Sequence, residues 1–277
     1  MVCCLWGDNM AGEMISAVRH DMQHDDHEIK VRKANALIQQ SRFSLSVQQQ
    51  KMVLYVLAHI MPSDKGFKTY EFSLAEFCKV CGIEYNGRSF HDLRVALKGI
   101  RDQSVWVDLP DGGHTTFAWI EEAYYNEGTG IVEIDLNKRM KPFLLELKKK
   151  YTEYELIYTL HFRSKYSIRL YELIKSRHYH ETEEYSFSYS VDELRQLMGA
   201  ETYSQYRDFK RKALIPAVNE INESSDISVE WAESPPARRG VKVLAINFSV
   251  APKPALERMQ IRDKVEKDLG WDQIALW

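Results

Sequence analysis

The chain has 277 residues, of which 28% are charged, and its net charge is −3. Because one domain usually holds about 150 residues, this length predicts two domains, and a hydrophobic content of 44% is ordinary for soluble domains. No apolar run approaches the roughly 18 residues that a membrane-spanning helix needs, so we expect no membrane association. The total charge excludes no class of partner, because association follows local charged patches.

The first 28 residues are predicted to form a disordered tail. They lack a basic segment that leads into an apolar one, so we expect no signal peptide and a cytoplasmic location. Cys3 and Cys4 lie in this tail, whereas Cys78 and Cys81 form a lone C-x-x-C pair. A structural zinc site usually has four ligands, and no second pair with suitable spacing follows. We therefore expect buried helix cysteines and no metal.

A helix over residues 46–60 is predicted to open the first domain, and a shorter helix follows within FSLAEFCKVCG, residues 72–82. Ser73, with Glu76 three residues later, is the capping-box arrangement of a helix N-terminus, and Gly82 suits the position after a helix end. A second helix then buries one apolar face. The apolar residues at helical spacing are Val47, Leu54, Leu57 and Ile60 in the opening helix, and Phe90, Leu93, Leu97 and Ile100 in the last one.

Two strand-like runs within residues 104–125 follow these helices, and Asp111-Gly112-Gly113 is a strong turn signal between them. An added strand over residues 130–137 and a further helix are expected next. The lysine run within LKKKYTEYE, residues 147–155, interrupts the apolar pattern and predicts a domain boundary near residue 150.

The second half repeats this order at an offset of 117 residues. An amphipathic helix over residues 164–178 leads into YSVDELRQLMG, residues 189–199, which matches FSLAEFCKVCG position for position. Ser190, Glu193 and Gly199 are identical to their counterparts in the first copy. The next helix has a buried face of Phe209, Ala213, Ala217 and Ile221. Two strands within residues 227–250 flank a turn over residues 235–240.

Helix, tight turn, helix and β-hairpin form a winged helix-turn-helix, and the repeat predicts two of them. The expected fold class is α+β, with two tandem winged-helix domains related by internal repetition. We assign residues 1–28 to the tail, 29–150 to the first domain and 151–250 to the second domain. Residues 251–277 are predicted to hold a linker, a charged helix and a loose end.

The second helix of each copy is the candidate DNA-reading element, because in this motif it lies in the major groove. Outward basic and amide side chains suit that task, since arginine bonds guanine and asparagine bonds adenine. In the second copy we expect an outward face of Arg207, Arg211, Ile215, Asn219 and Asn222, with Lys212 and Asp208 beside it. Lys210 is expected to be a phosphate contact at the helix margin. Pro216 predicts a kink or the boundary between the basic turn and the buried remainder.

The first copy carries a less varied basic set, which favours contacts with the DNA backbone over base readout. Its members are Arg88, Arg94, Lys98 and Arg101. Arg238 and Arg239 stand at the tip of the second wing, where they would follow phosphates or enter a minor groove. The first wing has no such pair, so we expect the stronger DNA contacts in the second domain.

Three stretches of the chain resemble the iteron-binding plasmid replication initiators of the twin winged-helix class. They are LSVQQQKMVLYVL, SKYSIRLYELIKS and YRDFKRKALIPAVNEINESSDISVEW, and the likeness covers roughly residues 30–250. The resemblance implies a protein that binds direct repeats at a plasmid origin as a monomer, promotes melting of AT-rich DNA and recruits host replication proteins such as the replicative helicase. It also implies a dimer that binds an inverted repeat and represses its own gene.

The resemblance places the base-reading residues on Arg211 and Lys212 and assigns dimerisation to the first domain. The wing sequence PPARRG and the cysteine-rich N-terminus depart from the family pattern, so the wing contacts follow from the residues alone.

Two other functions fit parts of the sequence. His178 to His180 read His-Tyr-His, and rolling-circle nucleases hold a metal with a His-hydrophobic-His pair, but here the histidines close an amphipathic helix. A winged-helix regulator without a replication role is the second alternative. We expect no enzymatic activity and no cofactor, and no Gly-rich phosphate loop is present in the sequence.

Overall fold

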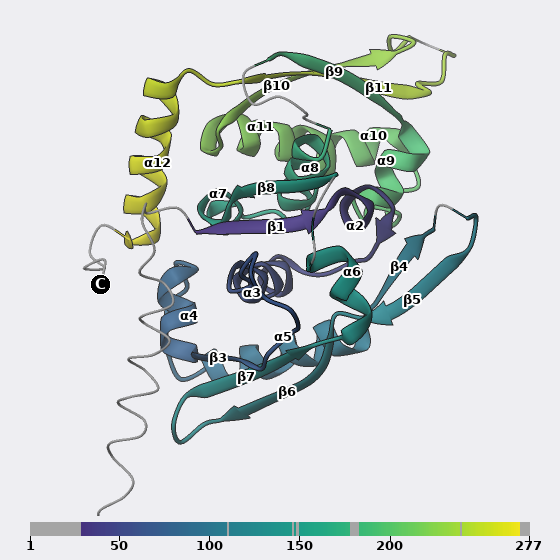
Figure 1. Ribbon diagram of the computed structural model, residues 1–277. Coiled ribbons are helices and arrows are strands. Elements are labelled where there is room, and N and C mark those ends of the chain that lie inside the picture. Colours follow the sequence, from purple (N-terminus) through teal and green to yellow (C-terminus); the bar gives the residue numbers. More distant parts are fainter. Residues whose placement is uncertain are drawn as a thin grey trace, which may run out of the picture.

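The computed structural model describes residues 29–109, 111–145, 147, 150–177, 183–238 and 240–271. The expected tail over residues 1–28, His178 to His180 and Arg239 lie outside the described residues. In Figure 1 the N-terminal half of the chain forms the lower part of the molecule, and residues after about 183 form the upper part. A two-stranded sheet and helices α7 (Leu156–His161) and α8 (Lys165–Lys175) lie between them.

The lower part is a winged-helix domain with additions at its N-terminus. It begins with β1 (Lys30–Ala34), α2 (Asn35–Gln39), β2 (Ser41–Arg42) and α3 (Val47–Ala58). The helix-turn-helix is α4 (Leu74–Val80) and α5 (Ser89–Asp102), and β3 (Tyr70–Ser73) precedes it. Four strands follow: β4 (Ser104–Asp108), β5 (His114–Ala118), β6 (Ile120–Asn126) and β7 (Ile131–Leu136). Two short helices, η1 (Lys138–Met140) and α6 (Lys141–Leu144), complete it.

The upper part is the second winged-helix domain. Strand β9 (Tyr185–Ser190) leads into α9 (Val191–Leu197). The second helix is built from α10 (Tyr206–Phe209), the π-helical segment η2 (Lys210–Leu214) and α11 (Ile215–Ser224). The wing strands are β10 (Ile227–Ser234) and β11 (Ala245–Pro252), and α12 (Ala255–Leu269) follows them. The sheet order is β10-β11-β9.

The internal repeat is confirmed at its helix ends. The hydroxyl of Ser73 accepts a hydrogen bond from the Glu76 backbone N–H at 3.0 Å, and Ser190 caps α9 in the same way at 3.1 Å. Gly82 and Gly199 adopt left-handed φ angles of 60° and 62° after their helices. Left-handed backbone is costly for residues with a Cβ atom, so glycine at both positions is a local requirement of the turn.

The sheets correct one expectation about the first domain. We expected the strand over residues 130–137 to be an addition that the second copy lacks, but β7 pairs with β3, as β11 pairs with β9 in the second domain. The β4–β5 hairpin instead pairs with β2. The buried Trp119 lies between β5 and β6, and the β6–β7 register shifts between Ile120 and Glu122. The first domain therefore carries two hairpins where the second carries one.

Helix α8 is buried on all sides rather than amphipathic. Every residue from Tyr166 to Ile174 is buried, including Arg169 and Glu172. Strand β8 (Tyr151–Glu155), which begins the range that we assign to the second domain, pairs antiparallel with β1 of the first. The two halves of the chain thus interlock through this sheet and α8, and the division at residue 150 stays a prediction.

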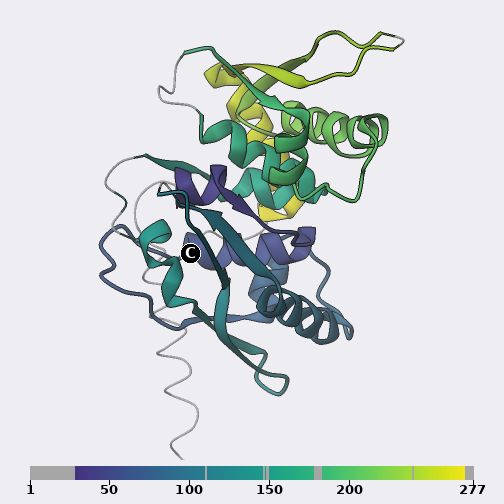
Figure 2. The ribbon, with the colours of Figure 1, turned by 90° about the vertical axis from the view of Figure 1, so that its right-hand side faces the viewer.

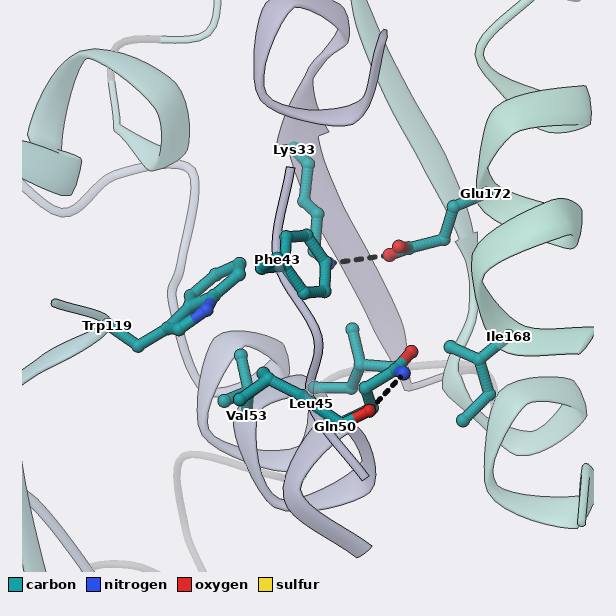
Figure 3. Close-up of a pocket in the computed structure, with 9 residues that line it drawn as sticks. Lys33, Phe43, Leu45, Gln50, Val53, Trp119, Ile168 and Glu172 are labelled. Atoms are coloured by element: carbon teal, nitrogen blue, oxygen red, sulfur yellow. Dashed lines mark hydrogen bonds and ion pairs between the residues drawn. The ribbon is translucent and has the colours of Figure 1, made fainter. Parts of the chain in front are cut away.

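A buried ion cluster holds this junction (Figure 3). Lys33 donates to the Glu172 carboxylate at 2.5 Å, and the Tyr154 hydroxyl donates to the same oxygen at 2.5 Å. Burial alone would raise the pKa of Glu172, but the charges of Lys33 and Arg169 outweigh it and lower that pKa. Arg169 also donates to the backbone oxygens of Ile38, Ser41 and Leu197. One buried side chain therefore connects the N-terminal segment to α9.

Candidate nucleic-acid interface

The basic stretch of the second domain lies on one continuous helix that changes its winding in the middle. Residues 210–214 are π-helical, and the Ile215 backbone N–H donates to the carbonyl of Lys210, five residues earlier. Pro216 follows immediately, at the start of α11. Proline has no N–H and would clash with the carbonyl four residues earlier, and a widened turn accommodates it without ending the helix. The expected kink is thus a π-turn placed within the basic cluster.

The solvent-facing side of this helix presents four of the residues predicted to contact DNA. Arg207, Arg211, Lys212 and Asn219 are all exposed, whereas Phe209, Ala213 and Ala217 are fully buried. Asp208 lies among the cations, 3.3 Å from the Arg211 guanidinium and 3.8 Å from the Lys212 ammonium. The face therefore has a net positive charge, with one carboxylate that orients two of its cations.

Lys210 does not extend from this face as an unpaired cation. Its ammonium lies 2.7 Å from the Glu233 carboxylate on β10 and 5.3 Å from the centre of the Trp231 ring. The Tyr206 hydroxyl donates to the same Glu233 oxygen at 2.7 Å, and the Ala237 N–H donates to the other oxygen at 3.2 Å. In this structure Lys210 joins the helix to the wing, so its predicted role as a phosphate contact would require it to leave Glu233.

Glu233 is a residue of this region whose contacts the sequence did not predict. Burial would raise the pKa of Glu233, but hydrogen bonds from Lys210 and Tyr206 and the charge of Lys210 outweigh burial and lower it. The carboxylate is therefore ionised at neutral pH and fixes the first turn of the helix against the wing. Only tertiary structure brings Glu233 to Lys210, and no sequence pattern marks the pair.

Asn222 also differs from expectation. Its side-chain amide donates to the Val229 carbonyl at 2.9 Å and accepts from the Val229 N–H at 2.6 Å. Because the Asn222 side chain both donates to and accepts from the backbone of β10, it connects the helix to that strand. The expected outward face therefore ends at Asn219.

Helix α5 carries the basic set of the first domain. Arg94 and Lys98 are exposed, and Lys98 forms an ion pair with Asp102 one turn later. Arg101 donates through its Nε to the Glu121 carbonyl at 3.1 Å, which holds α5 against β6. Arg88 is exposed at the position that precedes the helix. The helix is α-helical throughout, and the exposed Val95 lies among its cations.

The two wings differ in charge. Arg238 is exposed and forms an isolated bridge with Val241 at the tip of the second wing. In the first wing Asp108 accepts from Arg42 at 2.7 Å and lies 2.8 Å from the His114 Nδ1. His114 of this hairpin thus faces a carboxylate, and the arginine that pairs with the same carboxylate belongs to β2.

The two candidate helices lie on the same side of the molecule. Figure 2 shows α10–α11 in the upper half and α5 in the lower half, both toward the right of that view. Helices of this kind fit the major groove of duplex DNA, where guanidinium and amide groups bond base edges.

Other chemistry has little support within the described part of the chain. No group of three or more histidine, cysteine or acidic side chains is placed there to hold a metal ion. Cys78 and Cys81 are buried and reduced, and burial raises the pKa of the Cys78 thiol. None of the helices in the described ranges is long and apolar enough to cross a membrane.

Comparison with protein families gives two matches, one for each helix-turn-helix unit. The model described as "Initiator Replication protein, WH1" matches residues 30–175, and "Initiator Rep protein, WH2" matches residues 190–250. The helix-turn-helix units α4–α5 and α9–α11 fall within the first and the second match, respectively.

Two curated proteins and one solved structure are similar to this chain. A replication initiation protein of Escherichia coli is 25% identical over 209 residues, which cover 73% of this chain and 65% of the relative. The PI protein of Escherichia coli is 30% identical over 122 residues, which cover 39% of this chain and 40% of the relative. The chain thus spans less than two thirds of the length of either relative.

The crystal structure of the Pi initiator protein in complex with iteron DNA shares the fold, with a TM-score of 0.66 at 18% identity, over 83% of this chain and 99% of that one. The twin winged-helix architecture and the family resemblance that the sequence predicts are both confirmed. The chain belongs to the family of initiator replication proteins, and its two winged-helix domains are the WH1 and WH2 domains of that family.

Proposed function

We propose that this protein initiates plasmid replication by binding direct repeats at the origin as a monomer. In this proposal WH2 reads the base sequence through Arg207, Arg211, Lys212 and Asn219, while WH1 contacts the DNA backbone through α5. The protein acts in the cytoplasm, promotes melting of neighbouring AT-rich DNA and recruits host replication proteins, including the replicative helicase. As a dimer joined through WH1 it binds an inverted repeat and represses its own gene.

The observation that carries the proposal is the exposed basic face on the WH2 helix. Three cations and an amide project from a helix whose opposite side is fully buried, so packing explains none of them. Glu233 and Asn222 hold the same helix to the wing strand at both of its ends. A rigidly mounted basic helix is what base readout in a major groove requires, because loose side chains lose discrimination.

The WH1 helix supports a different contribution. Its Lys98 and Arg101 are engaged within the domain, which leaves Arg88 and Arg94 as the exposed cations of this set that form no ion pair with the described residues. Cations of this kind neutralise phosphates and fix orientation on the duplex without selecting a sequence. WH1 would therefore add affinity and position, and WH2 would add specificity.

Footprinting on the DNA that flanks the gene tests this function. We expect protection of direct repeats beside an AT-rich stretch, with a separate weaker protection of an inverted repeat near the promoter. Protection of the inverted repeat alone would identify a regulator without a replication role. Nicking of a supercoiled origin plasmid in the presence of Mg²⁺ or Mn²⁺ would instead identify a nuclease, and loss of nicking in His178→Ala would assign it to the His-Tyr-His segment.

A further inference from the structure

Helix α12 follows the second wing and lies beyond the region that the WH2 family model matches. It runs along one side of the molecule, from the WH2 sheet at the top of Figure 1 down to α4 of WH1. Of its 15 residues only Val265 and Leu269 are buried. Burial of an apolar face therefore does not explain why the helix lies there, and its polar contacts and its C-terminal end must hold it.

Helix α12 and the residue just before it are attached to the C-terminal end of the WH2 candidate reading helix. The ammonium of Lys253, a buried residue just before α12, donates to the Asn222 carbonyl. Lys264 forms an ion pair with Glu223 at 3.1 Å. Both acceptors belong to the last turn of α11, so α12 is fixed to the reading helix rather than only to the sheet from which it emerges.

Two further residues of α12, Arg262 and Asp268, attach the helix to the junction between the domains. Arg262 pairs with Glu155, the last residue of β8, and Asp268 lies 3.2 Å from the Nε2 of His161 at the end of α7. These contacts hold α12 against β8 and α7 along its path from WH2 to WH1.

The C-terminal end of α12 is clamped on the turn of the WH1 helix-turn-helix. The indole N–H of the buried Trp271 donates to the Val80 carbonyl at 2.8 Å. Leu269 packs so closely over Gly82 that an added Cβ there would lie 2.8 Å from the leucine Cδ2. Val80 and Gly82 are the residues at which the chain turns from α4 toward α5. The contact thus reaches the element that positions the WH1 helix.

We propose that α12 is a strut that fixes the separation of the two recognition helices, and that Trp271 is its positioning residue. A 15-residue α-helix is about 22 Å long and resists stretching, because each residue rises about 1.5 Å. Lys253 and Lys264 hold α11, and Leu269 and Trp271 hold the α4–α5 turn, so the strut sets the distance between the two DNA segments that the protein accepts. This inference rests on the proposed function, in which both domains contact one duplex.

The first measurement needs no DNA. Spin labels on Tyr124→Cys in WH1 and Glu230→Cys in WH2, both exposed positions, report the distance between the domains once Cys3 and Cys4 are replaced by serine. The wild-type background should give one narrow distance distribution, and Trp271→Ala should broaden it. Met259→Ala is the matched control, because Met259 is an exposed residue of the same helix and should leave the distribution narrow. An equally narrow distribution in Trp271→Ala would overturn the strut.

The second measurement compares a direct repeat with the same repeat carrying two extra base pairs between the segments protected by WH1 and WH2. Wild type and Met259→Ala should prefer the natural spacing by about 100-fold, because two linked sites gain affinity only when both engage at once. In Trp271→Ala the preference should fall to about tenfold or less. General destabilisation would weaken both complexes and leave the ratio unchanged, which would overturn the positioning role.

Trp271→Phe keeps a ring in the site and removes the N–H donor, so it decides the matter if Trp271→Ala does not fold. It should broaden the distance distribution and lower the spacing preference partway, and wild-type values for both would overturn the proposal. If wild type binds no DNA specifically, the proposed function fails together with the DNA-spacing role of α12. The distance distribution then decides the strut alone.

Discussion

The two winged-helix domains share one plan but differ where DNA would be read. In WH1 the second helix is regular, two of its four candidate cations are engaged within the domain, and Asp108 of the β4–β5 hairpin pairs with Arg42. In WH2 the second helix contains a π-turn under an exposed basic face, and Glu233 ties that helix to the wing. The same kind of turn and the same caps thus position the second helix in both domains. The attachment of that helix to the wing is what distinguishes the candidate DNA-reading helix of WH2.

The largest expected difference between the domains is in base readout. Arg211→Ala with Lys212→Ala should weaken binding to the natural repeat by roughly 100- to 1000-fold, since each specific base contact is worth about 1–3 kcal/mol. The matched pair in WH1, Arg94→Ala with Lys98→Ala, should weaken binding to specific and unrelated DNA by the same smaller factor. Gel-shift titrations on both DNAs measure, for each variant, the ratio of its affinity for the natural repeat to its affinity for unrelated DNA. Equal losses of this ratio in the two variants would contradict the proposal that WH2 reads bases and WH1 contacts the backbone.

The two turn glycines offer a stability test of the shared plan. A Cβ at Gly199 would lie 2.7 Å from the Phe43 carbonyl oxygen, which is backbone, whereas a Cβ at Gly82 would meet the tip of the Leu269 side chain. Gly199→Ala should therefore cost about 2–3 kcal/mol of unfolding free energy and Gly82→Ala about 1–2 kcal/mol, both including the left-handed backbone. Urea unfolding measures both. A larger cost at Gly82 would show that the WH1 turn is the more constrained of the two.

Glu233 predicts a pH dependence that belongs to WH2. Its pKa is lowered in the folded state, so its contribution to stability is complete above the unfolded pKa of about 4.3 and disappears as the pH falls through the lower folded value. Glu233→Gln should cost roughly 1–2 kcal/mol at pH 7. Unfolding free energies of both proteins, measured from neutral pH to pH 3, should converge at the acid end. A difference that grows on acidification would contradict the lowered pKa.

The smallest expected effect is at the second wing. Arg238→Ala should weaken binding to any sequence and reduce the slope of log K against log salt by about one, because one phosphate contact is lost. His114→Ala at the first wing, where the histidine already faces Asp108, should leave the slope unchanged. Salt titrations of the two variants provide the comparison, and an unchanged slope in Arg238→Ala would remove the wing from the interface.

The sequence was sufficient for features that repeat or that depend on local chemistry. Neighbouring residues determine helix caps, turn positions and the buried face of a helix. The sequence therefore predicted the caps at Ser73 and Ser190, the turns at Gly82 and Gly199, and the buried face from Phe209 to Ile221. Exposure of Arg207, Arg211 and Lys212 follows from the same helical period.

Contacts between distant segments of the chain could not be predicted from the sequence. Glu233 meets Lys210 only after β10 folds back on the helix, and Lys33 meets Glu172 only across the junction between the halves. Asn222 was expected to face DNA because its helical position is outward, yet β10 passes there and takes both of its hydrogen bonds. Residues 251–277 were expected to end loosely, whereas Trp271 is buried against WH1. The pairing of β3 with β7 in WH1 was not predicted for the same reason, since two successive hairpins give no local sign of which one joins β3.

Methylation interference tests the central claim, that the WH2 helix reads bases in the major groove, most directly. Dimethyl sulfate modifies guanine N7, the atom that an arginine would contact there. We predict that methylation of particular guanines within the repeat blocks binding of wild type, and that this interference disappears in Arg211→Ala with Lys212→Ala while it persists in Arg94→Ala with Lys98→Ala. The same interference pattern in wild type and in the Arg211→Ala with Lys212→Ala variant would contradict base readout by this helix.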